Sequence, residues 1–276
     1  MDKPAGPSSH AVVATVRRAV GRGVKVGHAG TLDPFATGLL VILVGRATRL
    51  ATYLSDLDKT YVADIRLGAT SATGDPEGPI TETGTPPERA LVAEALVSLT
   101  GRQRQRVPAH AAVKVGGERL YRLARRGEDV DRPVREIVVH TARLTDGPDA
   151  AGVVLIEIRA SNGTYIRSFA ADLGEALGCG GYCVALRRTR VGDLKVEDAV
   201  PPEEVRAEGG IGLARALAHL PAHPLSPEEA LAVGHGRPVA GDQQGTVALL
   251  EGGRLAAVAR GDGAELRPEV VMPRAA

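Results

Sequence analysis

The spacing of apolar residues along this chain changes repeatedly, and each change predicts a helix or a strand. Apolar residues three and four positions apart predict a helix from Ser8 or Ser9 to Val20, where a serine can cap the first turn. Strict alternation predicts a strand over 59–67, and the unbroken apolar run 39–44 predicts a buried strand. The same criteria predict further helices over 48–57, 86–99, 166–177 and 203–220, and strands over 134–144, 153–160, 246–250 and 255–259.

Glycine and proline divide these elements into two groups. Residues 68–87 are rich in Gly, Pro and Thr and predict an exposed loop, and Pro221, Pro224 and Pro227 predict a linker. We therefore expect a catalytic domain over 1–221 and a small β-rich domain over 222–276. Helices and strands follow one another in mixed order, which indicates an α+β or mixed α/β fold and not a doubly wound parallel sheet.

Composition narrows the class of protein. Of the 276 residues, 43% are hydrophobic, which supports a folded core, whereas only 3% are aromatic and none is Trp. No apolar stretch approaches the ~20 residues of a membrane span, and the first residues lack a signal peptide, so we expect a cytoplasmic protein. Cys179 and Cys183 lack a second pair of ligands at a zinc spacing, so we expect free thiols and no metal site.

Positive charge is unevenly distributed, although the formal net charge is only +1. Basic residues gather in three places, and the longest of these holds only Glu118 as an acid. Such clusters can be solvated helix faces, but three of them together favour a surface that follows a phosphate backbone. The clusters are Arg17, Arg18, Arg22 and Lys25; Arg102, Arg104, Arg106, Lys114, Arg119, Arg122, Arg125 and Arg126; and Arg187, Arg188 and Arg190.

One segment, residues 27–40, carries the strongest candidate for chemistry. It reads Gly-His-Ala-Gly-Thr-Leu-Asp-Pro-Phe-Ala-Thr-Gly-Leu-Leu, with a single carboxylate, Asp33. Gly30 and Gly38 permit backbone angles that other residues avoid, and Pro34 restricts the backbone of Asp33. A rigid loop at the edge of a core suits a nucleophile or a base, although an Asp-Pro pair can also simply begin a turn.

The whole segment resembles the signature of the TruB-type tRNA pseudouridine synthases, G-H-x-G-[ST]-L-D-P-x-A-[ST]-G-L-L. The resemblance implies that Asp33 is the nucleophile and that His28 lies against the target nucleotide. It also implies a fold with a bent, mostly antiparallel central sheet flanked by helices, followed by a small C-terminal domain similar to the PUA RNA-binding domain.

Two further motifs support the resemblance. Lys59-Thr60-Tyr61 matches K-x-Y, which implies that Tyr61 stacks on the target base and can serve as a base, although alternation alone predicts a core residue. Residues 161–168 match S-x-G-T-Y-I-R-[ST], which implies that Tyr165 lines the pocket and that Arg167 pairs with Asp33. A buried carboxylate is costly unless it is paired, so this partnership is physically coherent, whereas Arg167 without the motif would be a surface residue.

Other positions rest on the resemblance alone. Leu186 matches an apolar position that packs against the uracil, and Lys3 lies in a K-P-x-G match that implies support of the site. Residues 101–131 resemble an inserted segment that grips RNA, although His110 and Ala111 depart from its pattern P-x-[YF]-S-A-x-K. Its candidate RNA-binding residues are Lys114, Arg119, Arg122, Arg125 and Arg126.

Together these motifs predict an isomerase that flips a uridine out of the T-loop of tRNA, at position 55, and converts it to pseudouridine. No cofactor is expected because the reaction needs no redox change, and the family expectation is a monomer. The sequence leaves open whether Asp33 attacks C6 of uracil or C1′ of ribose. Three alternatives are a non-catalytic tRNA-binding or tRNA-folding module, a uridine isomerase acting on another RNA, and a phosphosugar enzyme with Asp33 as a base.

Overall fold

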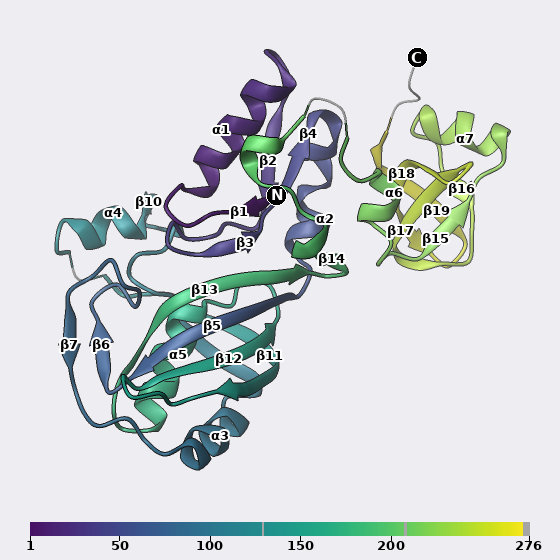
Figure 1. The fold of residues 1–276 in the computed structure, drawn as a ribbon. Helices are drawn as coiled ribbons and strands as arrows, with labels where there is room; N and C mark the ends of the chain where they lie inside the picture. Colours follow the sequence, from purple (N-terminus) through teal and green to yellow (C-terminus); the bar gives the residue numbers. More distant parts are fainter. Residues whose placement is uncertain (129, 207–208, 273–276) are drawn as a thin grey trace.

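Two large β-sheets, one of eight strands and one of five, organise the described residues, and Figure 1 shows them as separate units. The computed structural model describes residues 1–128, 130–206 and 209–272. All neighbours in the large sheet are antiparallel except β3 and β13, which confirms the predicted mostly antiparallel sheet. Its order is β1 (Asp2–Lys3), β3 (Thr37–Leu39), β13 (Gly181–Val191), β5 (Lys59–Leu67), β12 (Val153–Ala160), β11 (Val134–Asp146) and β8 (Gly101–Arg106), and β14 (Leu194–Lys195) pairs with β13.

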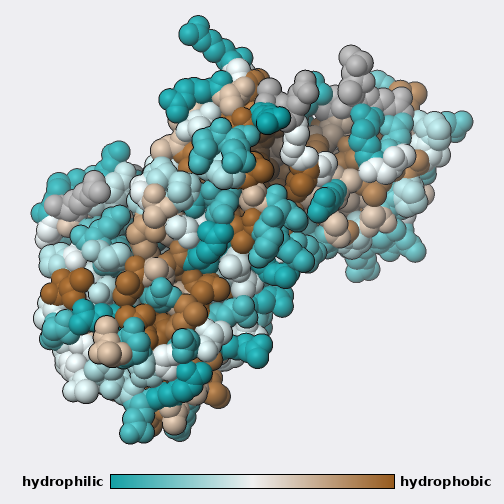
Figure 2. Space-filling model, viewed as in Figure 1, coloured by the Kyte–Doolittle hydropathy of each residue, from teal (hydrophilic) through white to brown (hydrophobic). Residues whose placement is uncertain are grey.

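The main core lies between this sheet and two helices, α3 (Arg89–Ser98) and α5 (Ile166–Ala176). Alternate residues of β5 are buried, as the sequence predicts, and Ile65 belongs to the same core as Phe169 of α5. The other residues of β5 are only half-buried, and Figure 2 shows apolar side chains exposed over β13 and β5 on the face turned toward the viewer. In α3 the buried side chains are Val92 and Leu96, whereas Leu91 is 52% exposed.

The apolar run 39–44 is two strands instead of the single predicted one. Leu40 interrupts it, because its backbone exchanges two hydrogen bonds with Met1. The preceding residues form β3 in the large sheet, and β4 (Val41–Val44) pairs with β2 (Val26–Ala29). The predicted helix near the N-terminus is α1 (Ser9–Val20), with the Ser8 side chain accepting from the Ala11 N–H, and a short helical stretch follows β4 as η1 (Gly45–Leu50) and α2 (Ala51–Ser55).

The second sheet contains the C-terminal strands and is covered by α7 (Pro227–Gly234). The predicted proline linker is wrong. Ala222–Pro224 forms an edge strand, where a proline is tolerated, and Pro227 begins α7. Apolar residues of this sheet, such as Val258, share one core with Leu43 and Leu50 of the N-terminal half. Its order is β15 (Ala222–Pro224), β17 (Gln244–Glu251), β18 (Arg254–Asp262), β19 (Glu265–Val271) and β16 (Val239–Ala240).

Four other segments form structure that the sequence analysis either did not assign or assigned wrongly. The basic segment 184–192 is mostly the core strand β13, and residues 101–106 form β8. The loop 68–87 contains a hairpin of β6 (Ala69–Ser71) and β7 (Ile80–Glu82). The predicted helix 203–220 is wrong in its described part, which holds only η3 (Pro202–Glu204) and α6 (Leu213–Ala216), because Gly209 and Gly210 adopt positive φ angles. A 3-10 turn, η2 (Val196–Asp198), follows β14.

Within the described residues, no helix is long and apolar enough to cross a membrane.

Candidate active site

Asp33 and Arg167 form an ion pair with two hydrogen bonds, although 134 positions separate them in the chain. Arg167 Nε donates to Oδ2 at 2.9 Å, and Nη2 donates to Oδ1 at 3.2 Å. The arginine side chain is 3% exposed, whereas that of Asp33 is 33% exposed. The pair therefore places a permanent positive charge against one side of the carboxylate and leaves another side open.

Arg167 is held by three further groups. Its Nη1 lies 3.3 Å from Oδ2 of Asp75 and donates to the carbonyl of Thr73 at 2.9 Å, while Nη2 donates to the carbonyl of His110 at 3.1 Å. Asp75 is buried, and it accepts hydrogen bonds from the Thr73 hydroxyl and from the Glu77 N–H. Every nitrogen of the guanidinium has a partner, so its orientation toward Asp33 is fixed.

Sequence reasoning missed Asp75. It lies in the turn between β6 and β7, inside the segment that we expected to be an exposed loop. The available signal is that Asp75 precedes a proline in a glycine-rich stretch, which is also the context of Asp33.

Arg188 holds the loop of Asp33 through hydrogen bonds to its main chain. Its side chain is 1% exposed, and it donates to three carbonyls that flank the loop: those of Leu39 at 2.8 Å, Gly30 at 3.0 Å and Thr31 at 3.3 Å. Our expectation that this third basic cluster follows a phosphate backbone is therefore wrong for Arg188. The cause is the alternation of β13, which turns Arg188 into the molecule, whereas neighbouring Arg187 pairs with Asp2.

Two residues near the N-terminus also hold this loop. Lys3 Nζ donates to the carbonyl of Pro34 at 3.1 Å, and the Ser9 hydroxyl bonds both the N–H and the carbonyl of Leu32 at 2.9 Å. Burial lowers the pKa of Lys3 to about 8, and the charge of Asp33 opposes that shift. Lys3 thus supports the loop directly, and Ser9 is a second contact that sequence reasoning missed.

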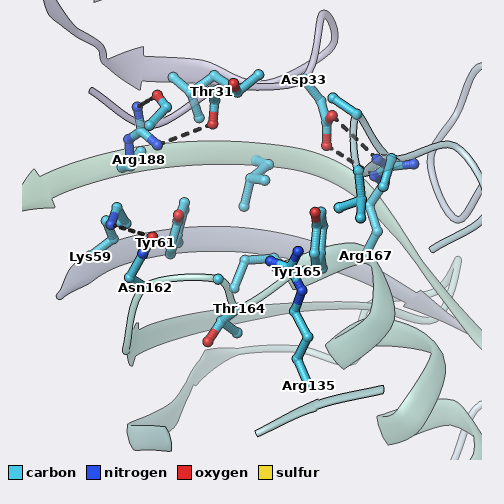
Figure 3. Close-up of a pocket in the computed structure, with 18 of the residues that line it drawn as sticks. Thr31, Asp33, Lys59, Tyr61, Arg135, Asn162, Thr164, Tyr165, Arg167 and Arg188 are labelled. Carbon is cyan, nitrogen blue, oxygen red and sulfur yellow. Dashed lines mark hydrogen bonds and ion pairs between the residues drawn. The ribbon is translucent and has the colours of Figure 1, made fainter. Parts of the chain in front are cut away.

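A cavity of about 520 Å³ opens beside the Asp33 carboxylate. Predicted residues that line it are Asp33, Tyr61, Tyr165, Arg167 and Leu186. Figure 3 shows Tyr61 and Tyr165 rising toward the loop that carries Asp33. Burial raises the pKa of the Tyr165 phenol, so this group is neutral near pH 7 and offers the cavity a ring face and an O–H donor.

The inserted segment forms part of the cavity wall. It contains β9 (Lys114–Val115), β10 (Glu118–Arg119) and α4 (Leu120–Arg125), and both Lys114 and Arg119 line the cavity. Ala111 is buried in a small apolar cluster with Val107 and Leu120, against which Tyr165 packs.

Arg122 and Arg126, two other candidate RNA-binding residues of the insertion, are not among the described residues that line the cavity. Arg126 is paired with Glu118 and Glu128, and the guanidinium of Arg122 lies 6.0 Å from the ring centroid of Tyr121. The side chain of Arg125 lies outside the described residues.

His28 lies in β2 and is not among the residues that line the cavity. Its ring meets that of His10 edge to face, with 5.4 Å between centroids, and its buried Nδ1 has no hydrogen-bond partner within the described chain. Burial lowers the pKa of His28, with the charges of His10 and Arg188 acting in the same direction. The ring is therefore largely neutral near pH 7.

Among the residues described, no group of three or more His, Cys, Asp or Glu side chains could hold a metal ion. Cys179 and Cys183 are buried free thiols.

Comparison with known proteins places these features in a family. Residues 17–166 match a family model described as TruB family pseudouridylate synthase (N terminal domain). Residues 167–211 match one described as tRNA pseudouridylate synthase B C-terminal domain. The boundary between the two matches falls at the start of α5, inside the unit built on the large sheet.

Curated relatives cover nearly the whole chain. A tRNA pseudouridine synthase B from Thermobifida fusca is 46% identical over 98% of this chain and 96% of its own length. The protein of the same name from Synechococcus is 43% identical over 98% of this chain and 95% of its own. Among solved structures, a chain in the crystal structure of a Cbf5-Nop10-Gar1 complex has a TM-score of 0.75 and 28% identity, covering 99% of this chain and 84% of that one.

Proposed function

This chain belongs to the TruB family of pseudouridylate synthases, and from that premise we propose that it converts uridine to pseudouridine at position 55, in the T-loop of tRNA, with Asp33 as the nucleophile. The observation that carries the proposal is the Asp33–Arg167 pair, which presents a half-exposed carboxylate to a cavity of nucleotide size. The curated relatives that are 46% and 43% identical are named as tRNA enzymes, which supports tRNA as the substrate.

The chemistry is an isomerisation. The bond between uracil N1 and ribose C1′ breaks, the base turns, and a bond forms between C1′ and C5. C5 then loses its proton and N1 gains one, so atoms and electrons balance without an oxidant or an energy donor. Asp33 attacks the nucleotide and is released unchanged, and Arg167 holds the carboxylate in its attacking position.

Tyr61, Tyr165 and Leu186 bind the reacting base. The two tyrosines supply aromatic faces, and Leu186 supplies an apolar surface on the cavity wall. A uridine within a folded T-loop is stacked on its neighbours, so it must be flipped into the cavity, at a cost of a few kcal/mol that stacking on these rings offsets. In this proposal Tyr61 also serves as a base, and His28 contacts the loop from which the nucleotide has left.

RNA outside the cavity is bound by the basic insertion. In this proposal Arg122, Arg125 and Arg126, which belong to α4 or follow it directly, contact the phosphates of that RNA, in the same insertion as the cavity-lining Lys114 and Arg119. Residues 222–276 form a small PUA-like domain in this proposal, next to a catalytic domain over 1–221. The enzyme acts as a monomer in the cytoplasm on the T-arm of its substrate.

Mapping of pseudouridine in tRNA tests the proposal. The purified protein should modify an unmodified tRNA transcript at one T-loop uridine, and cells without it should lack pseudouridine there. Modification of a different RNA, with tRNA left unchanged, would support a uridine isomerase with another substrate. Tight tRNA binding without any pseudouridine would instead support a non-catalytic tRNA-binding module.

A further inference from the structure

The cavity is strongly cationic. Among the described residues that line it, Asp33 is the only acid, whereas six carry a positive charge: Lys59, Lys114, Arg119, Arg135, Arg167 and Arg188. Such an excess favours an anionic ligand, but only where the positive charges are free to meet it.

Four of the six cations already bind carboxylates, carbonyls or an amide of the protein itself. Arg167 binds Asp33 and Asp75, and Arg188 donates to the three loop carbonyls. Lys59 Nζ donates to the carbonyls of Ser55 and Leu57 and to Oδ1 of Asn162, and Arg119 donates to the carbonyl of Ala112.

Arg135 and Lys114 differ from these four cations in their exposure and in their contacts. Both side chains are exposed, and neither makes a hydrogen bond or an ion pair with any described side chain. They come from separate parts of the chain, Arg135 from β11 of the large sheet and Lys114 from β9 of the insertion, yet both line the same cavity. Figure 3 shows Arg135 extending from its strand toward Tyr165.

Arg135 lies at the edge of the cavity beside a glycine. A Cβ added to Gly163, in the turn before Tyr165, would lie 3.8 Å from Nη1 of Arg135, at ordinary contact distance. Because Gly163 has no side chain and lines the cavity together with Arg135, no side chain of that residue stands between the guanidinium and a ligand beside Tyr165, the ring proposed to stack on the base. A nucleotide in the cavity carries a phosphate on each side of its ribose, and a guanidinium matches a phosphate with two parallel hydrogen bonds.

We propose that Arg135 binds a backbone phosphate adjoining the nucleotide in the cavity, and that Lys114 binds the same phosphate from the insertion. This inference rests on the proposed function, because it takes an RNA as the ligand. Its consequence is that the substrate itself joins the insertion to the large sheet. Arg135 is then a substrate-binding residue outside the motifs that the sequence analysis singled out.

Replacement of Arg135 by glutamine tests the contact. Arg135→Gln should lower kcat/KM on tRNA by about 10-fold and reduce the slope of log affinity against log salt by about 0.7 to 0.9, the loss of one phosphate contact. Arg143→Gln is the matched control, because Arg143 is an exposed arginine on the same strand that does not line the cavity. Equal behaviour of the two variants would overturn the inference.

A chemical substitution in the RNA makes the test specific. A T-arm stem–loop with an uncharged methylphosphonate on one side of the target uridine, and then on the other, removes one phosphate charge at a time. At one of the two positions the substitution should weaken binding to the wild-type protein but not to Arg135→Gln. If it weakens binding to both proteins equally at each position, Arg135 does not bind these phosphates.

Lys114 is tested by a double-mutant cycle. If Arg135 and Lys114 share one phosphate, the loss in the Arg135→Gln, Lys114→Gln protein should be smaller than the product of the single losses. Multiplicative losses would overturn the sharing. Failure of the wild-type protein to modify tRNA would instead reject the proposed function, so the two failures are distinguishable.

Discussion

Asp33 and Asp75 bind different edges of one guanidinium, that of Arg167, one through Nε and Nη2 and the other through Nη1. One carboxylate is half-exposed at the cavity and the other is buried. A single arginine thereby connects the reacting group to the interior of the protein, and the two acids have separable roles.

The first prediction concerns the exposed acid. Asp33→Asn should fold, bind tRNA and lose pseudouridine formation by at least about 10³-fold, because the amide keeps the shape of the carboxylate but is not a nucleophile. Single-turnover assays with tRNA measure this. Asp58→Asn is a matched control, since Asp58 is similarly exposed and also pairs with an arginine, Arg159 at 2.9 Å, away from the cavity. Appreciable turnover by Asp33→Asn would remove Asp33 from the mechanism.

The second prediction concerns the buried acid. Asp75→Asn leaves Asp33 paired but removes one anchor of Arg167, so kcat should fall by roughly 10²-fold through misplacement of the carboxylate, while KM changes little. Steady-state kinetics separate the two parameters. Glu77→Gln, an exposed neighbour in the same turn, should leave both unchanged. A rise in KM at constant kcat would show that Asp75 acts on binding and not on the ion pair.

The third prediction concerns the close approach of β3 and β13. Gly38 has a φ of 99°, and a Cβ there would lie 2.3 Å from the carbonyl oxygen of Arg188. Gly38→Ala should lower the free energy of unfolding by about 3 to 5 kcal/mol, from backbone strain and overpacking together. Gly6→Ala isolates the strain, because Gly6 has a φ of 102° in open space, and it should cost about 1 to 3 kcal/mol. Equal costs in denaturant unfolding would contradict the steric argument.

The fourth prediction compares two arginines of the insertion. Arg126 is neutralised by Glu118 and Glu128, whereas Arg122 is exposed and rests near the Tyr121 ring. Arg122→Ala should therefore reduce the salt dependence of tRNA affinity more than Arg126→Ala does. Binding titrations between about 50 and 200 mM salt measure both slopes. A larger effect at Arg126 would mean that RNA displaces its two acidic partners.

The fifth prediction is a pH dependence of stability. Burial lowers the pKa of Lys3 from 10.5 to about 8, so between these values the unfolded chain holds a proton that the folded chain has released. The free energy of unfolding should rise with pH in that window, by at most about 1.4 kcal/mol per pH unit from this residue. Lys3→Met should show a shallower slope, and the contribution of Lys59 cancels because both proteins contain it. Identical slopes would exclude Lys3 as the cause.

Much of the fold followed from the sequence because local pattern and burial agree. The strand predicted over 59–67 is present, and so is the helix at 166–176. Each has one apolar face, and that face packs against the core. The predicted helix over 203–220 failed where glycines with positive φ interrupt it, and the linker failed because strand pairing overrode its prolines.

The residues of the site also differ in how far the sequence could predict them. Asp33, Tyr61, Tyr165 and Arg167 belong to contiguous motifs, so the sequence alone could identify them as candidates. Asp75 and Arg188 contact segments that are distant in the sequence, whereas the sequence around Asp75 is that of an ordinary turn and the sequence around Arg188 that of an ordinary basic strand. The roles of such residues can be recognised only from the folded structure.

The insertion meets the ion pair through its main chain, at the carbonyl of His110. Every amino acid supplies an identical oxygen, so this contact places no demand on which side chain stands at that position. The histidine found there, in place of the aromatic residue of the family pattern, can therefore be exchanged for another residue in the course of evolution without loss of the hydrogen bond to Arg167.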